Sequence, residues 1–157
     1  MILKEHTLSS QIVKNKKAYF DYEILETFEA GIVLVGTEVK SLRLGKVKLV
    51  DAFCQINDKM ELELLQMEIA PYSHGNRTNH EISRYRKLLM HKNQIRRLFQ
   101  TMRLKGLTLV PLSMYFKRGK VKVELGLARG KKLHDKRSVL KEKDALREID
   151  RSVKIKV

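Results

Sequence analysis

The chain has 157 residues, the length of one domain with an appendage, and 43% of them are hydrophobic, which excludes disorder throughout. Lysine and arginine number 33 against 18 acidic residues, and the net charge of +15 makes a polyanion the expected partner. No apolar run reaches the roughly 18 residues of a membrane span, and the single Cys54 cannot form an internal disulfide, so we expect a cytoplasmic protein that binds RNA or DNA.

The first part of the chain predicts an arm and two strands. Residues 1–17 are polar and lack a sustained period, so we expect a flexible arm there. Residues 19–28 alternate between apolar and polar side chains, which is the period of a half-buried strand. The tripeptide EAG at 29–31 is expected to turn the chain into a second strand over residues 31–36.

The next segments predict a short helix and a hairpin. Thr37 is expected to cap a helix that ends at Gly45. Residues 49–58 and 60–72 are rich in apolar side chains and are separated at Asn57–Asp58, a pair typical of turns. We therefore expect two antiparallel strands there.

The third part predicts a loop, a helix and a final hairpin. Residues 73–87 form a long polar connection without a period. Residues 90–106 place apolar side chains at helical spacing and end on a glycine, which predicts an amphipathic helix. Residues 107–116 and 120–128 are expected to be strands joined by a turn at 117–119.

Together these elements predict a mainly β fold. Six short strands with tight turns and one clear helix favour a small OB-fold-like closed antiparallel β-barrel with flanking helices, over residues 18–130. Residues 131–157 are dominated by charge and carry an apolar stripe too narrow to hold an isolated helix together. We therefore expect a basic C-terminal tail that is disordered alone and helical when docked.

One stretch concentrates the cations. Between Arg84 and Lys105 there are eight Lys or Arg residues and no acid. A basic face kept for solubility is one interpretation, and a surface that contacts phosphates is the other, which the excess charge elsewhere favours. Tyr85 and Arg86 are suited to stacking on an exposed base.

Two further positions are candidates for contact with nucleic acid. Glu29 represents either ordinary turn chemistry or a carboxylate that selects bases by accepting hydrogen bonds from their amino and imino groups. His134 and Asp135 are adjacent in the most basic part of the tail. We expect Asp135 to cap the tail helix and His134 to stack on a nucleobase.

Catalysis is not expected. His74 and His80 share a polar loop, but Cys54 is distant in sequence and the spacing matches no zinc site. Nucleophile, P-loop and dinucleotide motifs are missing from the sequence, and its acids are scattered. We therefore predict no metal, no cofactor and no enzymatic activity.

Four segments carry a family resemblance. They are NKKAYFDYEILETFEAGIVLVGTEVKSLRLGK (15–46), RKLLMHKNQI (86–95), LTLVPLSMYFKRGKVKVELGLARGKK (107–132) and HDKR (134–137). In these segments the chain resembles the SsrA-binding protein family, small protein B. The resemblance implies an OB-like body that binds the transfer-RNA-like domain of transfer-messenger RNA (tmRNA). It also implies a tail that enters the decoding centre and empty messenger channel of stalled ribosomes.

The resemblance further implies an adaptor in trans-translation, which rescues the ribosome and tags the unfinished peptide, with elongation factor Tu as an indirect partner. We expect a monomer. Matched positions and the cations around them make up the expected tmRNA-binding residues: Asn15, Lys16, Lys17, Tyr22, Glu29, Lys40, Arg43, Arg84, Arg86, Lys87 and Leu89. The expected decoding-centre residues are Lys131, Lys132, His134, Asp135, Lys136, Arg137, Ile149 and Val153.

Two rival functions belong to other classes. A general single-stranded nucleic-acid-binding OB module would need aromatic platforms, and aromatic residues make up 6% of the chain. An RNA-processing enzyme would use His134 and nearby acids, and would cleave RNA in the presence of a divalent metal.

Overall fold

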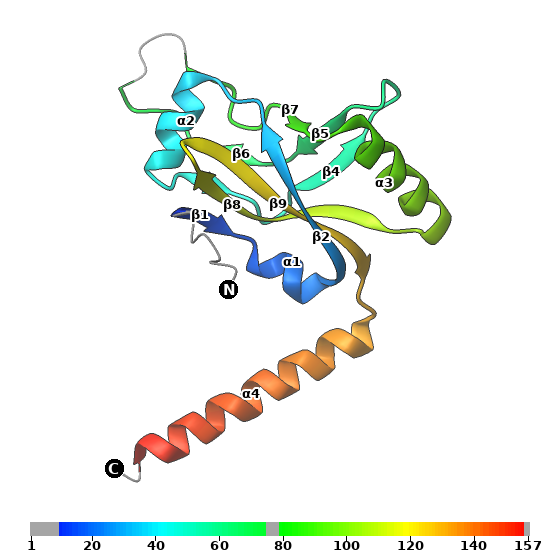
Figure 1. Ribbon diagram of the computed structural model, residues 1–157. Coiled ribbons are helices and arrows are strands. Elements are labelled where there is room, and N and C mark those ends of the chain that lie inside the picture. Colours follow the sequence, from blue (N-terminus) through cyan, green and yellow to red (C-terminus); the bar gives the residue numbers. More distant parts are fainter. Residues whose placement is uncertain (1–9, 75–78, 156–157) are drawn as a thin grey trace, which may run out of the picture.

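The computed structural model describes residues 10–74 and 79–155, which form nine strands and four helices (Figure 1). In chain order the elements are β1 (Ser10–Lys14), α1 (Lys16–Asp21), β2 (Tyr22–Ile32), α2 (Gly36–Arg43), β3 (Val47–Lys48), β4 (Phe53–Ile56), β5 (Leu62–Leu65), β6 (Glu68–Ile69), β7 (Arg86–Leu89), α3 (Lys92–Lys105), β8 (Thr108–Lys117), β9 (Lys120–Gly130) and α4 (Leu133–Ile155). The predicted mainly β fold with flanking helices is confirmed.

The strand pairings run in a circuit. Strand β8 pairs with β4, and the order continues through β5, β7, β2 and β9, which pairs again with β8. All of these pairings are antiparallel, and β1 pairs with residues 113–116 of β8, on the edge that β4 meets at Leu109. Strands β3 and β6 form a separate two-stranded sheet. Buried residues of the strands in the circuit make up most of the main core.

Alternation along β9 fills that core. Val123 and Leu125 are fully buried, whereas Lys120 at the start of the strand is exposed, as the period of two predicts. Helix α3 covers the core with the buried residues Ile95 and Leu98. It ends where expected, because Gly106 has a φ of 62° and its N–H bonds back to the carbonyl of Met102.

The two predicted hairpins are confirmed. Arg118 and Gly119 both have positive φ values, 51° and 74°, which suits the tight turn that joins β8 to β9. In the β4–β5 connection, the side-chain oxygen of Asn57 accepts the N–H groups of Lys59 and Glu61, both at 3.0 Å. These bonds fix the turn locally.

The predicted turn at 29–31 is wrong. Strand β2 continues through these residues to Ile32, with Glu29 opposite Glu124 and Gly31 opposite Leu89 of β7. A side chain at Gly31 would lie 3.3 Å from the Cβ of Leu89, so this glycine permits close approach of two strands. The second strand predicted over 31–36 is therefore not formed as such.

The N-terminal prediction also needs correction. Residues 10–14 form β1, which pairs with β8, and residues 16–21 are helical, so a flexible arm is wrong for the second half of the range 1–17. The first nine residues lie outside the described part of the chain. The alternation from Tyr19 onward predicted a strand three residues too early, because α1 extends to Asp21.

Helix α2 begins by a different device from the predicted Thr37 cap. Val35 occupies the N-cap, and the Glu38 carboxylate accepts its N–H at 3.0 Å. The ring of His80 lies 3.0 Å (Nε2) from the carbonyl of Ile69 and 2.9 Å (Nδ1) from the Thr37 hydroxyl. Since a carbonyl can only accept, Nε2 donates to Ile69.

A buried charge network joins α2 to the chain entering β7. Glu38 and Arg86 are both fully buried, and Arg84 is partly exposed. Glu38 accepts from both guanidinium groups at 2.7–2.8 Å, and Arg86 also donates to the carbonyl of Met67. Burial alone would raise the pKa of Glu38, but the hydrogen bonds and charges of the two arginines hold it below its ordinary value.

We predict that Glu38→Gln destabilises the fold by about 3–5 kcal/mol, because it leaves the buried guanidinium of Arg86 without its counter-charge. The free energy of unfolding in urea at pH 7 measures the loss. Glu26→Gln is the control, since Glu26 is exposed on β2 and its neutralisation should change the stability by less than about 0.5 kcal/mol.

The same variant should alter the acid dependence of stability. Because the pKa of Glu38 is lowered in the folded protein, its contribution is complete above the unfolded pKa and is lost as the pH falls through the folded one. The difference in unfolding free energy between the wild type and Glu38→Gln should therefore shrink as the pH is lowered, and urea titrations at several pH values measure it. A difference that stays the same at every pH would contradict this assignment.

Candidate nucleic-acid interface

The basic stretch from Arg84 to Lys105 divides into two parts in the structure. In and before β7 the cations have internal partners: Arg84 pairs with Glu38, and Lys87 with Glu61 at 2.7 Å. Arg86 is fully buried, so the prediction that it contacts RNA or stacks on a base is wrong. Sequence alone did not separate these arginines, because the buried Glu38 is 48 residues away from Arg86.

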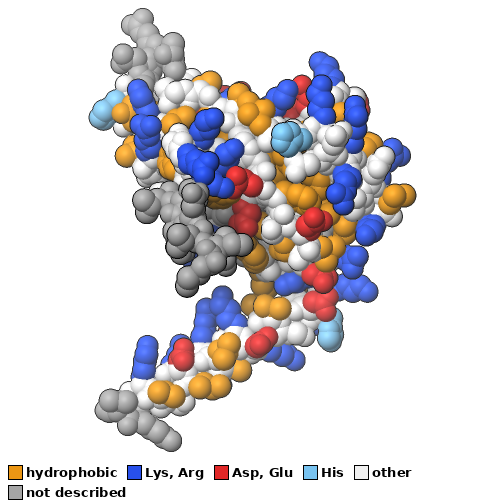
Figure 2. Space-filling model, viewed as in Figure 1, with side chains coloured by type: hydrophobic (Ala, Val, Ile, Leu, Met, Phe, Trp, Pro, Cys, Tyr) orange, Lys and Arg blue, Asp and Glu red, His pale blue; other side chains and the backbone are white. Residues whose placement is uncertain are grey.

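Helix α3 presents the available cations. Lys92, Arg96 and Arg103 are exposed, and their spacing of four and seven residues places them on one flank of the helix. Within the described residues no ion pair is recorded for these three side chains, although Arg103 also lies over the ring of Phe99 at 5.5 Å. Figure 2 shows Lys and Arg side chains spread over the body and along α4. The flank on α3 is suited to phosphate contact.

Residues at α1 have two different roles. Asn15 is buried, its amide donates to the carbonyls of Leu49 and Pro111 at 3.0 Å, and its oxygen accepts the N–H of Ala18. It therefore shapes the start of α1 and does not present a side chain to a partner. Lys16 is exposed, and Lys17 pairs with Asp51 at 3.0 Å.

Glu29 belongs to a cross-strand cluster on β2 and β8. The Tyr115 hydroxyl donates to its carboxylate at 2.5 Å, and the ammonium of Lys117 lies 3.1 Å away. The hydrogen bond from Tyr115, followed by that from Lys117, keeps the pKa of Glu29 below its ordinary value despite partial burial. Burial and the same hydrogen bond raise the pKa of Tyr115.

The structure excludes one of the two interpretations of Glu29. Ordinary turn chemistry is wrong, since the residue lies within a strand. Its carboxylate has two partners within the chain, and it holds the side chains of Tyr115 and Lys117 together. Local sequence patterns could not reveal this arrangement, because Tyr115 and Lys117 lie 86 and 88 residues away from Glu29.

The other predicted body residues lie on several elements. Leu89 is 51% exposed and stands beside Gly31, on the same outer face of the β2–β7 wall as Glu29. Tyr22 is half-buried against the small cluster around Ala18. On α2, Lys40 lies over the ring of Tyr72 at 5.4 Å, and Arg43 is exposed. The structure thus brings Glu29 and Leu89 together and leaves the α1 and α2 residues on separate patches.

The tail residues lie on α4, which projects away from the sheet (Figure 1). The helix begins at Leu133, so Asp135 is in its first turn and the predicted cap is wrong, although an acid there still suits the helix dipole. The His134 side chain is 91% exposed. Lys136 pairs with Asp21 at 3.2 Å and anchors the helix to α1.

The remaining tail positions are open to a partner. Exposed apolar side chains recur at Leu146, Ile149 and Val153, a spacing of three and four residues that places them on one face. Lys132 and Arg137 are exposed, whereas Lys131 is partly covered and its ammonium donates to the carbonyl of Tyr19. The helix therefore offers both cations and an unpartnered apolar stripe.

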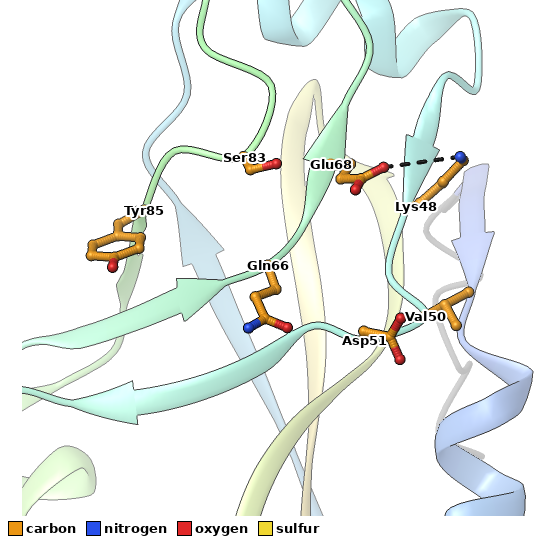
Figure 3. A pocket seen from close by; sticks show the side chains of 7 residues that line it. All are labelled: Lys48, Val50, Asp51, Gln66, Glu68, Ser83 and Tyr85. Atoms are coloured by element: carbon orange, nitrogen blue, oxygen red, sulfur yellow. Dashed lines mark ion pairs between the residues drawn. The ribbon is translucent and has the colours of Figure 1, made fainter.

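A hollow missed by sequence reasoning lies beside the two-stranded sheet (Figure 3). It measures about 410 Å³. Its lining residues come from three segments of the chain and are Lys48, Val50, Asp51, Gln66, Glu68, Ser83 and Tyr85. Spacing could not reveal it, because the polar side chains that line it are isolated in sequence.

Two other site classes find no support in the described residues. Across 10–74 and 79–155, no three His, Cys, Asp or Glu side chains converge as metal ligands would. None of the helices in these ranges combines the length and apolarity needed to cross a membrane.

Comparison with known proteins identifies the family. A profile of the SmpB protein family matches residues 12–155. The SsrA-binding protein of Carboxydothermus hydrogenoformans is 58% identical over 91% of this chain and 95% of its own length. The SsrA-binding protein of Pelobacter propionicus is 55% identical over 92% and 95% of the two chains.

A solved structure gives the same relationship in three dimensions. The structure from "tmRNA-SmpB: a journey to the center of the bacterial ribosome" is similar with a TM-score of 0.64 and 56% identity, covering 77% of this chain and 85% of that one. The predicted resemblance is confirmed. From the β-strands of its body to the basic helix at its end, this chain belongs to the SmpB family, the SsrA-binding proteins.

Proposed function

We propose that this protein binds the transfer-RNA-like domain of tmRNA and delivers it to stalled ribosomes for trans-translation. The observation that carries the proposal is the extent of the family match, which includes the body and almost all of the tail helix. The relatives are named for binding SsrA RNA, and the similar structure is one of tmRNA and SmpB on the ribosome.

In this proposal the body is an OB-like barrel, and the circuit of pairings from β8 round to β9 is its wall. The outer face carrying Glu29 and Leu89 meets the folded RNA. The exposed flank of α3 holds phosphates, and the Glu29 carboxylate orients Tyr115 and Lys117 for contact. No step of this adaptor role needs a cofactor or a reaction by the protein itself.

The tail is proposed to act on the ribosome. Its cations and His134 would enter the decoding centre, while Ile149 and Val153 would pack in the messenger channel. The support is that α4 is tied to the body by few polar contacts and buries little apolar surface. Such a helix frays easily when free and gains stability on docking. We also propose that the protein acts in the cytoplasm as a monomer. Elongation factor Tu is its proposed indirect partner.

Competition between RNAs tests the binding function. We expect the transfer-RNA-like domain to remain bound in a large excess of unstructured oligonucleotides, and its affinity to fall steeply with salt. Among the described residues, only Tyr19 and Tyr85 are exposed aromatics, too few for a general stacking platform. Displacement by random single strands at stoichiometric amounts would favour the single-strand module instead.

Glu29→Gln should weaken binding of this RNA by roughly tenfold, the effect of about 1.4 kcal/mol, although it makes the protein more positive. The reason is that Tyr115 and Lys117 lose the charge that positions them. Glu26→Gln on the same strand changes the net charge equally and should not weaken binding. If both variants bind more tightly, long-range charge alone governs affinity and the positioning role is refuted.

Truncation after Gly130 should separate binding from delivery. The truncated protein keeps the body intact, so we expect RNA affinity within about threefold of the wild type, while tagging of stalled peptides is lost. Affinity is measured by titration and tagging in a reconstituted translation system. Loss of both RNA binding and tagging in the truncated protein would contradict the proposal that the body binds RNA and the tail acts in delivery.

A further inference from the structure

The hollow beside β3 and β6 is lined by an exposed aromatic ring, that of Tyr85, on a segment of backbone held by hydrogen bonds. Tyr85 is 65% exposed, yet its neighbours Arg84 and Arg86 are both bonded to Glu38. Arg84 also donates to the carbonyl of Tyr85 at 3.2 Å. The backbone is therefore held in place, and a ring presented this way loses little conformational freedom when a ligand stacks on it.

The hollow differs in charge from the rest of the molecule. The whole chain carries +15, but the lining has two carboxylates, Asp51 and Glu68, and one ammonium, Lys48. Lys48 faces Glu68 at 3.9 Å. Asp51 also has an ammonium partner, Lys17 of α1, so each carboxylate is paired and no cation in the lining is left over for a phosphate. A neutral group with hydrogen-bond donors and acceptors suits this lining better.

The polar lining matches the edge of a nucleobase. In Figure 3 the Tyr85 ring stands on one side of the hollow, Val50 and Asp51 on the other, and Gln66 and Ser83 between them. Gln66 has a φ of 57°, an unusual backbone conformation for a residue with a side chain. An amide, a hydroxyl and carboxylates together can pair with the amino, imino and carbonyl groups of a base.

The hollow lies next to the lysines of α1, Lys16 and Lys17, which the sequence predicts as RNA-binding residues. Asp51 pairs with Lys17 of α1 at 3.0 Å, so the α1 patch and the hollow adjoin. An RNA strand whose phosphates lie on the α1 lysines can therefore place a neighbouring base in the hollow.

We propose that this hollow binds one unstacked nucleobase of the RNA, with Tyr85 stacked on its face and Gln66 and Asp51 hydrogen-bonded to its edge. The proposal rests on the proposed function for the identity of the RNA. The ligand class follows from the ring, the charge balance and the polar lining.

The test compares Tyr85→Ala with Tyr85→Phe on the transfer-RNA-like domain. We expect the alanine variant to lose roughly five- to 150-fold in affinity, and the phenylalanine variant to stay within about threefold of the wild type, because the stacking face is kept. Leu104→Ala is the matched control, since Leu104 is 86% exposed on α3 and its truncation should change nothing.

Two further readouts separate base binding from a phosphate contact. The dependence of log Kd on log salt should keep its slope in Tyr85→Ala, because no phosphate contact is removed. Chemical probing of the RNA bases should reveal a nucleotide protected by the wild type and reactive with Tyr85→Ala or Gln66→Ala. Unchanged affinity in Tyr85→Ala, or an equal loss in Tyr85→Phe, would overturn the proposal.

The outcome is distinguishable from failure of the proposed function. If the wild type prefers random single strands, the function proposed above fails, and the same pair of Tyr85 variants on those strands still measures stacking. If the wild type binds the folded RNA and Tyr85→Ala binds it equally well, the base site alone is refuted.

Discussion

The carboxylate of Glu38 binds Arg84 and Arg86, which lie 46 and 48 residues further along the chain. It receives Arg84 and Arg86 on its two oxygens and also accepts the N–H that starts α2. A buried charge of this kind is tolerated only when its partners are complete, so the network specifies one arrangement of α2, the loop before β7 and β7 itself. The hollow and the exposed Tyr85 depend on that arrangement.

The cations of the body therefore fall into two groups, those paired with acidic side chains of the protein and those exposed on α3. Arg84, Arg86 and Lys87 are occupied by internal acids and build the wall. The flank of α3 remains exposed, and Glu29 of β2 holds Tyr115 and Lys117 of β8 across the intervening strand β9. Net charge attracts RNA to the whole molecule, whereas these held groups are suited to deciding where it binds.

Local patterns predicted much of the fold from sequence. The α3 periodicity, the final hairpin and the β4–β5 turn were found because each depends on neighbouring residues. The course of β2 was missed because Gly31 serves a contact with Leu89 of β7, which no local pattern records. Arg86 was misassigned for the same reason: its burial depends on Glu38, a distant partner. Family resemblance supplied the function, and structure then separated supporting residues from exposed ones.

The central claim is that the body recognises one folded RNA through positioned groups, and that charge alone is insufficient. Its most direct measurement is sequencing of the RNA that co-purifies with the full chain from a bacterial lysate at physiological salt. The account predicts strong enrichment of tmRNA over messenger, ribosomal and transfer RNAs relative to their abundance. A bound population that merely mirrors total cellular RNA would contradict it.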